Sequence, residues 1–162
     1  MTKYTRNHPQ DPYSDEDVST VEGPESISGT GIDSMLARYI RLANKRDLEG
    51  LLDLYADEPS VSLEGRPMGR DLRTNMRRAV RAWRDVHARF EKVHVENTSR
   101  EGDTVAVDCV IPSRGRLFAF AKRFDFHKHL EFTRYGDRWL ITADDTREAG
   151  IIGRVLSLTG MV

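Results

Sequence analysis

One stretch near the C-terminal end of the chain, residues 117–148, constrains the fold more than any other. It divides into two long segments of alternating character around the turn sequence Tyr135-Gly136-Asp137. Because side chains of a strand point alternately to the two faces of a sheet, this alternation predicts two strands joined by a tight turn. The apolar side chains of the first strand share one parity: Phe118, Phe120, Phe124, Phe126, Leu130 and Phe132.

The opposite face of the first strand is charged and polar. Either the phenylalanine face packs under helices and the charged face lies outside, or the phenylalanines form a subunit interface and the charged face lines a pocket. We favour the first arrangement, since the concave face of a sheet should be apolar. A β-bulge near Lys122 or Lys128, which share the phenylalanine parity, would switch the faces midway. The residues of the charged face are Arg123, Asp125, His127, His129, Glu131 and Thr133.

Length and charge predict one domain with a differently charged extension. The 162 residues suffice for a single core. Residues 1–33 carry a net charge of −5, so the remainder carries +4 to reach the total of −1. We therefore expect a disordered acidic tail over 1–32, a folded domain over 33–148, and an apolar C-terminal segment over 149–162.

The cysteine count and the length of the apolar runs indicate in which cellular compartment the protein is expected. Cys109 excludes an internal disulfide and is expected to be a core residue. No apolar run approaches the roughly 20 residues that span a bilayer, and no secretory h-region is present near the N-terminus. We expect a soluble, cytoplasmic protein.

The first half of the domain reads as helical. Helices are expected from Asp33 or Ser34, over 48–55 and over about 70–86, with a short strand at 60–63. Asp57-Glu58-Pro59 should end the second helix, because proline disfavours helical geometry in the residue before it. Strands are expected over 87–99 and 104–112, followed by a turn at 113–116. Helices followed by strands predict an α+β fold, a curved, mostly antiparallel sheet with three helices on its concave side.

Two segments carry a family resemblance: LLDLYADEPSVSLEGRPMGRDLR and GDRWLITADDTRE. With the order of elements over 33–148, they resemble the nuclear transport factor 2-like superfamily in its SnoaL-like branch. The resemblance implies a cone-shaped α+β barrel, commonly dimeric, with a pocket between sheet and helices. It also implies either a non-catalytic binding or assembly module, or an enzyme such as a ketosteroid isomerase, scytalone dehydratase, polyketide cyclase or limonene epoxide hydrolase. Such enzymes use carboxylates, histidines and tyrosines of the pocket, without metal or organic cofactor.

Parity on the last strand selects the first candidate catalytic carboxylate. Asp145 shares its parity with Trp139 and Ile141, so it should reach the pocket, while Asp144 should face out. Tyr55 is the second candidate, on the inward stripe of the expected second helix. Tyr39 on the first helix and Trp139 are expected to bind substrate.

The charged row of the first long strand supplies the other candidates. Arg123, Asp125 and His127 lie two residues apart, so they share a face. The Arg-x-Asp pair is similar to that of limonene epoxide hydrolases, with Asp145 or Asp144 on the adjacent strand as the second carboxylate. Asp125 and His127 of this row are catalytic candidates, and Arg123 is a substrate-binding one. His127 and His129 lack a metal-binding motif, and we expect neither metal nor cofactor.

These observations favour a cofactor-independent isomerase, cyclase, dehydratase or epoxide hydrolase that acts by acid/base chemistry on a small apolar molecule. The alternative is a non-catalytic ligand-binding or assembly module that uses the sheet face and the C-terminal segment. We expect a homodimer and no membrane partner. Nucleic-acid binding is also not expected, because the arginine stripe on the third helix lacks interleaved aromatics. That stripe consists of Arg70, Arg73, Arg77, Arg81 and Arg84.

Overall fold

The computed structural model describes residues 21–22, 31–68 and 71–148. The predicted C-terminal segment 149–162 and residues 1–20 and 23–30 of the predicted tail lie outside the described residues. Within the described ranges, none of the helices combines the length and the apolar character that crossing a membrane requires.

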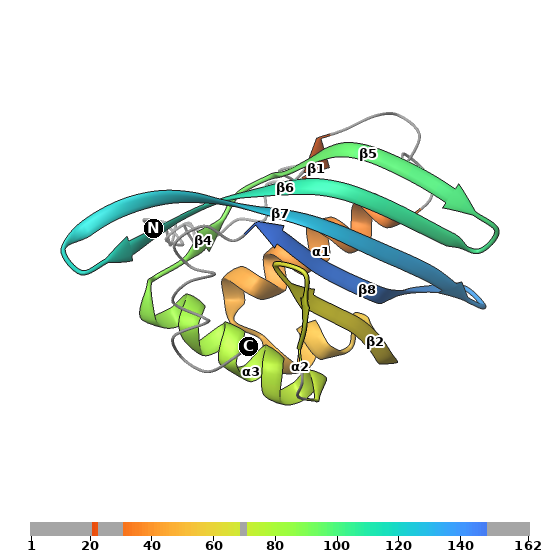
Figure 1. The fold of residues 1–162 in the computed structure, drawn as a ribbon, viewed down its shortest axis with the longest axis horizontal. Helices are drawn as coiled ribbons and strands as arrows, with labels where there is room; N and C mark the ends of the chain where they lie inside the picture. Colours follow the sequence, from red (N-terminus) through yellow and green to blue (C-terminus); the bar gives the residue numbers. More distant parts are fainter. Residues whose placement is uncertain (1–20, 23–30, 69–70, 149–162) are drawn as a thin grey trace, which may run out of the picture.

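The first and third helices begin and end near the expected positions, and the second helix ends earlier than expected. The helices are α1 (Ile32–Lys45), α2 (Leu48–Leu52) and α3 (Leu72–Asp85). Asp47 and Asp71 cap α2 and α3, each accepting a hydrogen bond at 2.9 Å from the backbone N–H three residues ahead. The three helices lie on one side of the sheet (Figure 1).

The described strands form one open sheet in the order β1-β5-β6-β7-β8-β2-β3, with β4 paired to β6. Pairing is parallel between β1 and β5 and between β2 and β8, and antiparallel elsewhere. The predicted α+β class, with a curved, mostly antiparallel sheet under three helices, is confirmed. The strands are β1 (Val21–Glu22), β2 (Tyr55–Leu63), β3 (Arg66–Pro67), β4 (Arg89–Phe90), β5 (Val93–Glu101), β6 (Thr104–Leu117), β7 (Phe120–Tyr135) and β8 (Arg138–Glu148).

The phenylalanine face of β7 forms part of the core, as the first of the two arrangements predicts. Phe126, Leu130 and Phe132 are buried and Phe124 is partly buried against them. Cys109 on β6 is also a core residue, and burial raises the pKa of its thiol to about 12. The charged face of β7 therefore lies on the outer side of the sheet.

Tyr55 lies on a strand and not on the predicted second helix. Helix α2 ends at Leu52, and the Leu54 carbonyl accepts a hydrogen bond at 2.8 Å from the N–H of Ile141, which ties the chain to β8. Residues 57–59 do not end a helix but lie within β2, where the pairing with β8 shifts register between Tyr55 and Ser60. A proline fits there because that irregular segment needs no ladder N–H.

The predicted turn at 113–116 is wrong, because β6 continues to Leu117 and the chain turns at residues 118–119. Gly115 serves close packing instead. A Cβ there would lie 2.8 Å from the Val86 carbonyl oxygen and 2.9 Å from the Phe124 ring. The Arg116 N–H donates to the same carbonyl at 2.6 Å. The end of α3 thus sits directly on this part of the hairpin.

Two further boundaries differ from the prediction. The strand expected over 87–99 is divided into β4 and β5, and β5 continues to Glu101. Val21–Glu22, inside the predicted disordered tail, pairs in parallel with the start of β5.

Gly115→Ala should destabilise the fold, because the added methyl group meets backbone that cannot move away independently. We expect a loss of about 1–3 kcal/mol in the free energy of unfolding, measured by urea denaturation. Gly65→Asn is the control, since Gly65 has φ +77° with open space around it and asparagine tolerates that conformation. Equal losses in the two variants would contradict the close-packing role of Gly115.

Candidate active site

A β-bulge in β8 determines which of two carboxylates, Asp144 or Asp145, points into the protein. Glu131 of β7 pairs with Ala143, but the next residue, Phe132, pairs with Ile141, so Thr142 is the extra residue. The Thr142 hydroxyl donates to the Glu131 carbonyl at 3.3 Å, which fixes the bulge against β7. One extra residue reverses the parity of everything after it. Ile141, Asp144 and Thr146 are consequently buried on the helix side.

Asp144 is held by two donors from neighbouring strands. The Tyr55 hydroxyl of β2 donates to Oδ2 at 2.6 Å, and Lys128 Nζ of β7 donates to Oδ1. The side chains of Lys128 and Asp144 are only 9% and 5% exposed, so this is a buried ion pair. Each carboxylate oxygen therefore has a partner, as a charge out of water requires.

Lys128 keeps its charge in this setting. Burial by itself would lower the pKa of Lys128, but the adjacent Asp144 carboxylate outweighs burial and raises that pKa above the usual lysine value. The ammonium also lies 5.6 Å from the centre of the Tyr39 ring, within range of a cation–π contact. Lys128, the charged residue in the phenylalanine row of β7, is therefore inside the protein, at the face of the buried Tyr39 ring.

The two tyrosines stay neutral over a wide pH range. Burial, followed by the charge of Asp144, holds the pKa of Tyr55 well above the usual tyrosine value. Burial also raises the pKa of Tyr39, an effect that the charge of Lys128 opposes. Both hydroxyls are consequently available as hydrogen-bond donors. We call Tyr39, Tyr55, Lys128 and Asp144 the buried cluster.

A cavity of about 80 Å³ lies between α3 and the sheet, beside the buried cluster. A water molecule needs roughly 10–15 Å³ of such space, so the cavity can hold several waters or a small organic group. Tyr55, Lys128 and Asp144 are its titratable groups among the described lining residues. Its walls are otherwise mostly apolar and include Leu63, Leu72, Met76, Trp83, Phe90 and Phe126.

Asp145 lies outside this cavity. The inward position predicted for Asp145 is occupied by Asp144. The Ser62 hydroxyl donates to Asp145 Oδ1 at 2.6 Å, and Arg147 Nε lies 3.7 Å from Oδ2. The prediction assumed an unbroken alternation along β8, and the bulge at Thr142 invalidates it. Tyr55 does line the cavity, although from a strand.

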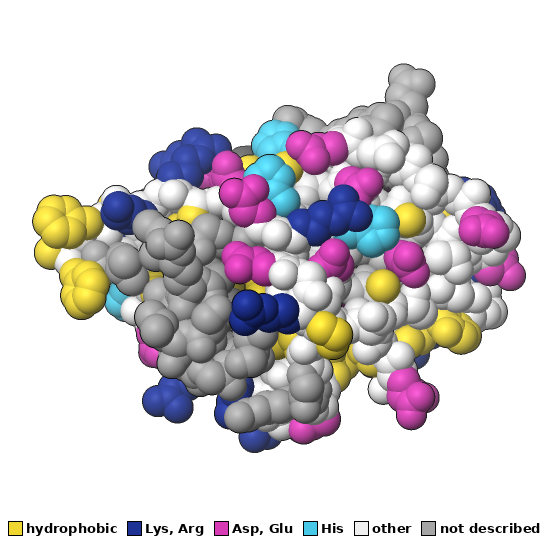
Figure 2. Space-filling model, in the orientation of Figure 1, with side chains coloured by type: hydrophobic (Ala, Val, Ile, Leu, Met, Phe, Trp, Pro, Cys, Tyr) yellow, Lys and Arg dark blue, Asp and Glu magenta, His cyan; other side chains and the backbone are white. Residues whose placement is uncertain are grey.

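The remaining predicted residues of β7 lie on the outer face of the sheet. Asp125 is exposed, and its carboxylate lies 3.9 Å from Arg123, whose guanidinium is also 4.0 Å from Glu91. His127 shares that face and does not line the cavity. Figure 2 shows histidine, acidic and basic side chains interspersed across one face of the molecule. These residues are not brought together with Tyr55.

The two predicted substrate-binding aromatics occupy different places. Tyr39 is buried behind Lys128 and does not line the cavity. Trp139 borders a separate surface hollow of about 330 Å³ near the start of α1. That hollow is larger, but Asp53 in it already pairs with Arg38 at 3.4 Å and Arg138 at 3.6 Å. Its charged groups are largely exposed, so the smaller cavity with the buried cluster is the better candidate site.

Sequence reasoning missed Lys128 and Asp144. A signal for Lys128 was present, since it is a charged residue on an otherwise apolar strand face. Asp144 had no such signal, because only the pairing of β8 with its neighbours places it inward. Among the described residues no group of three or more His, Cys, Asp or Glu side chains is arranged to hold a metal ion.

Comparison with solved structures identifies the architecture. No family model and no curated protein matches the sequence. A protein of unknown function from Mycobacterium tuberculosis is similar with a TM-score of 0.58 and 17% identity, over 73% of this chain and 69% of that one. An NTF2-like protein with a cystatin-like fold from Novosphingobium aromaticivorans is similar with a TM-score of 0.56 and 17% identity, over 78% and 86%.

A ketosteroid isomerase-like protein from Erwinia carotovora is also similar, with a TM-score of 0.56 and 11% identity, over 72% of this chain and 92% of that one. The chain has the nuclear transport factor 2-like fold. At these identities the likeness concerns the NTF2-like fold alone. The SnoaL-like branch within it stays a prediction.

Within this NTF2-like fold, Lys128 and Asp144 should depend on each other for stability. Lys128→Met and Asp144→Asn each leave a buried charge without its partner, so we expect each to cost about 3–5 kcal/mol. The double variant removes both charges and keeps an oxygen acceptor for Tyr55, so its loss should be far below the sum. Urea unfolding of all four proteins measures this coupling. Asp145→Asn is the control, and additive losses would show that the ion pair is not coupled.

The buried tyrosines should make the protein sensitive to alkali. Because folding raises the pKa of Tyr39 and Tyr55, the stability from keeping them neutral is complete below about pH 10 and is lost as pH rises through their folded pKa values. Ultraviolet titration of phenolate should show two tyrosines ionising later than the others. Their ionisation should coincide with the loss of tertiary circular dichroism. Tyr135→Phe should leave that late phase unchanged, and Tyr55→Phe should reduce it.

Proposed function

We propose that this protein binds a small, mostly apolar molecule in the cavity under α3 and transfers a proton on it with Asp144, without a cofactor. One observation carries the proposal: a mostly apolar cavity holds a single carboxylate among its described lining residues, fixed beside an ammonium and a tyrosine hydroxyl. Convergent polar groups in an apolar pocket are typical of small-molecule sites.

The chemistry of the walls defines the ligand. Its apolar part packs against side chains such as Met76, Trp83 and Phe126, and one oxygen of the ligand meets the polar end of the cavity. Lys128 has three N–H donors and gives one to Asp144, so the ammonium can also donate to a ligand oxygen. A carbonyl compound satisfies both requirements.

The reaction follows from the two charges. An oxygen of Asp144 accepts a proton from the carbon next to the ligand carbonyl, and negative charge then develops on the carbonyl oxygen. The ammonium of Lys128 stabilises that charge in a site of low dielectric. Where the ligand has a carbon–carbon double bond between its β- and γ-carbons, returning the proton to the γ-carbon moves that double bond into conjugation with the carbonyl and completes an isomerisation. The likeness to a protein described as ketosteroid isomerase-like supports this class of reaction.

A binding module without catalysis is the second candidate. Each carboxylate oxygen of Asp144 already has a donor, so a proton added to either oxygen has to compete with an existing hydrogen bond. In that case the same cavity binds its ligand through Lys128, and the cluster serves only to orient it.

Hydrogen exchange separates the two candidates without knowledge of the natural substrate. Small cyclic ketones are incubated with the protein in heavy water, and deuterium incorporation next to the carbonyl is followed by NMR. We expect exchange in the native protein and a loss of about 10²–10⁴-fold in Asp144→Asn, the range typical of a general base. Asp145→Asn, the adjacent carboxylate on the outer face, should exchange at the native rate. Asp144→Glu should recover part of the activity.

The same samples give the contrary outcomes. Ligand-induced NMR shifts in the native protein without any exchange would support the binding module. Exchange that Asp144→Asn leaves unchanged would remove Asp144 from the chemistry. Absence of both shifts and exchange across the ketone panel would exclude a carbonyl ligand.

A further inference from the structure

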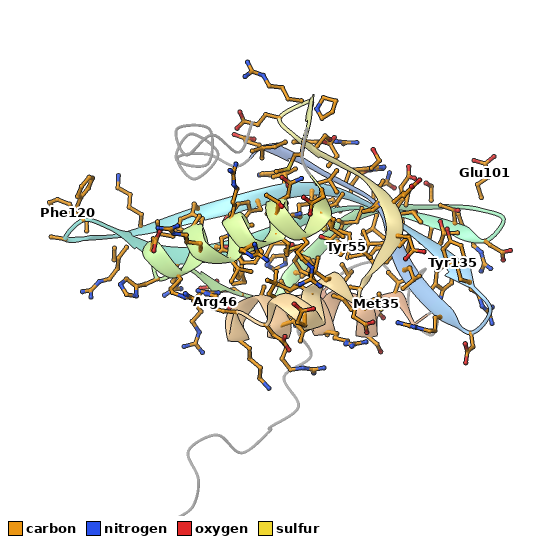
Figure 3. All side chains as sticks on the ribbon, turned by 90° about the horizontal axis from the view of Figure 1, so that it is seen from below. Met35, Arg46, Tyr55, Glu101, Phe120 and Tyr135 are labelled. Atoms are coloured by element: carbon orange, nitrogen blue, oxygen red, sulfur yellow. The ribbon has the colours of Figure 1, made fainter. Side chains whose placement is uncertain are left out.

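The hairpin of β6 and β7 extends beyond the body of the protein and exposes two aromatic side chains at its tip. Phe118 is 93% exposed and Phe120 is 70% exposed. Figure 1 shows the tip projecting past the end of α3, and Figure 3 places Phe120 at the end of the molecule opposite Glu101 and Tyr135. Hydrophobic side chains gather at that end in Figure 2. Large apolar groups projecting together from a surface mark an interaction site.

The backbone at the tip is strained in a way that displays one ring. Phe118 has φ +57°, in the left-handed region that L residues with bulky side chains rarely adopt. Gly102 and Gly136 occupy the comparable turn position in the β5–β6 and β7–β8 hairpins, and Glu64 with φ +50° occupies it in the β2–β3 hairpin. A glycine would relieve the strain here too, yet the chain carries a phenylalanine.

A basic collar lies directly behind the apolar tip. We use this term for Arg114, Arg116, Lys122 and Arg123, the charged residues between Ser113 and Phe124, a segment without an acidic residue. Arg114 and Arg123 pair opposite each other, three ladder positions behind the Leu117–Phe120 pair. At about 3.3 Å per residue, the collar therefore ends roughly 10 Å behind the tip.

Part of the positive charge of the collar is not neutralised by an ion pair within the described residues. Arg114 lies 2.5 Å from Glu91, and Arg123 lies 4.0 Å from Glu91 and 3.9 Å from Asp125, so these two cations are paired. Within the described residues no carboxylate forms an ion pair with Arg116 or Lys122, the two cations nearest the tip.

We propose that this hairpin docks the protein on an anionic lipid surface, with Phe118 and Phe120 in the bilayer interface and the basic collar at the phosphates. Apolar groups of interfacial segments reach roughly 5–10 Å into the boundary between headgroups and acyl chains. The collar lies one to three ladder positions behind the Leu117–Phe120 pair, roughly 3–10 Å, which overlaps that depth. This proposal is independent of the cavity and departs from the expectation that no membrane is involved.

The arrangement suits a bilayer better than a nucleic acid. A single-strand platform carries aromatics and cations side by side along one groove. Here the five consecutive residues of the tip, Leu117-Phe118-Ala119-Phe120-Ala121, contain no hydrogen-bonding side chain. The cations begin at Arg116, which pairs with Ala121, and continue away from the tip. A partner that approaches the tip therefore meets apolar side chains before it meets most of the positive charge.

Vesicle flotation of the full chain tests the proposal. Vesicles of phosphatidylcholine alone are compared with vesicles that also contain phosphatidylserine, at low and high salt. We expect binding to the serine-containing vesicles that weakens with salt. Replacing Arg116 and Lys122 by glutamine should lower partitioning about thirtyfold, because each cation near an anionic surface contributes about a factor of five. Phe118→Ser with Phe120→Ser should abolish binding.

Matched controls come from the other hairpins. Tyr135→Ser removes an exposed aromatic from the β7–β8 tip, and Arg100→Gln with Arg134→Gln removes two exposed cations whose side chains donate to turn carbonyls. Both controls should bind vesicles as the native protein does. Phe120→Trp should give a blue shift of tryptophan emission with phosphatidylserine only, beyond any shift in the native protein, which contains Trp83 and Trp139.

Several results would overturn the proposal. These are no flotation of the native protein, equal loss in the controls, or binding that ignores the phenylalanine pair. A salt-sensitive shift with single-stranded RNA and none with vesicles would assign the hairpin to nucleic acid. A change of oligomeric state in Phe118→Ser with Phe120→Ser, without vesicle binding in the native protein, would assign it to a second copy of the chain.

Discussion

The ion pair between Lys128 and Asp144 joins the strands that the rest of the domain is packed on. With the Tyr55 hydroxyl it links β7, β8 and β2 inside the protein. Taking two charges out of water is favourable only when each has a partner and the remaining hydrogen-bonding capacity is used. The three side chains therefore depend on one another for their stable burial. The mostly apolar cavity lies beside them, between α3 and the sheet.

How much of this site follows from sequence depends on whether the relevant rule is local. The alternation that buries Phe126, Leu130 and Phe132 is a local property of one strand, and it correctly orients that face. Asp144 is different, because a bulge is defined by the register between β8 and β7. No property of residues 141–145 by themselves distinguishes Asp144 from its neighbour.

Gly115 and Tyr55 show a second reason for the limits of sequence. Glycine marks either a turn or a close approach of two segments, and Ser113-Arg114-Gly115-Arg116 fits a turn equally well. The deciding atom, the Val86 carbonyl oxygen, belongs to the distant end of α3. Tyr55 similarly continues the apolar spacing of α2, but its neighbour Leu54 bonds to β8. Tertiary pairing overrides the local pattern in both cases.

One strand explains both the interior site and the exposed tip. Lys128 and Phe120 share a parity on β7, so the same face of the strand carries each of them. Lys128 is buried and Phe120 is exposed because helices cover this face of the strand at Lys128 and not at Phe120. The last residues of α3 contact β6 at Gly115 and Arg116, and the hairpin continues beyond that point. The face that forms the core under α3 is therefore left uncovered at the tip, where Phe120 is 70% exposed.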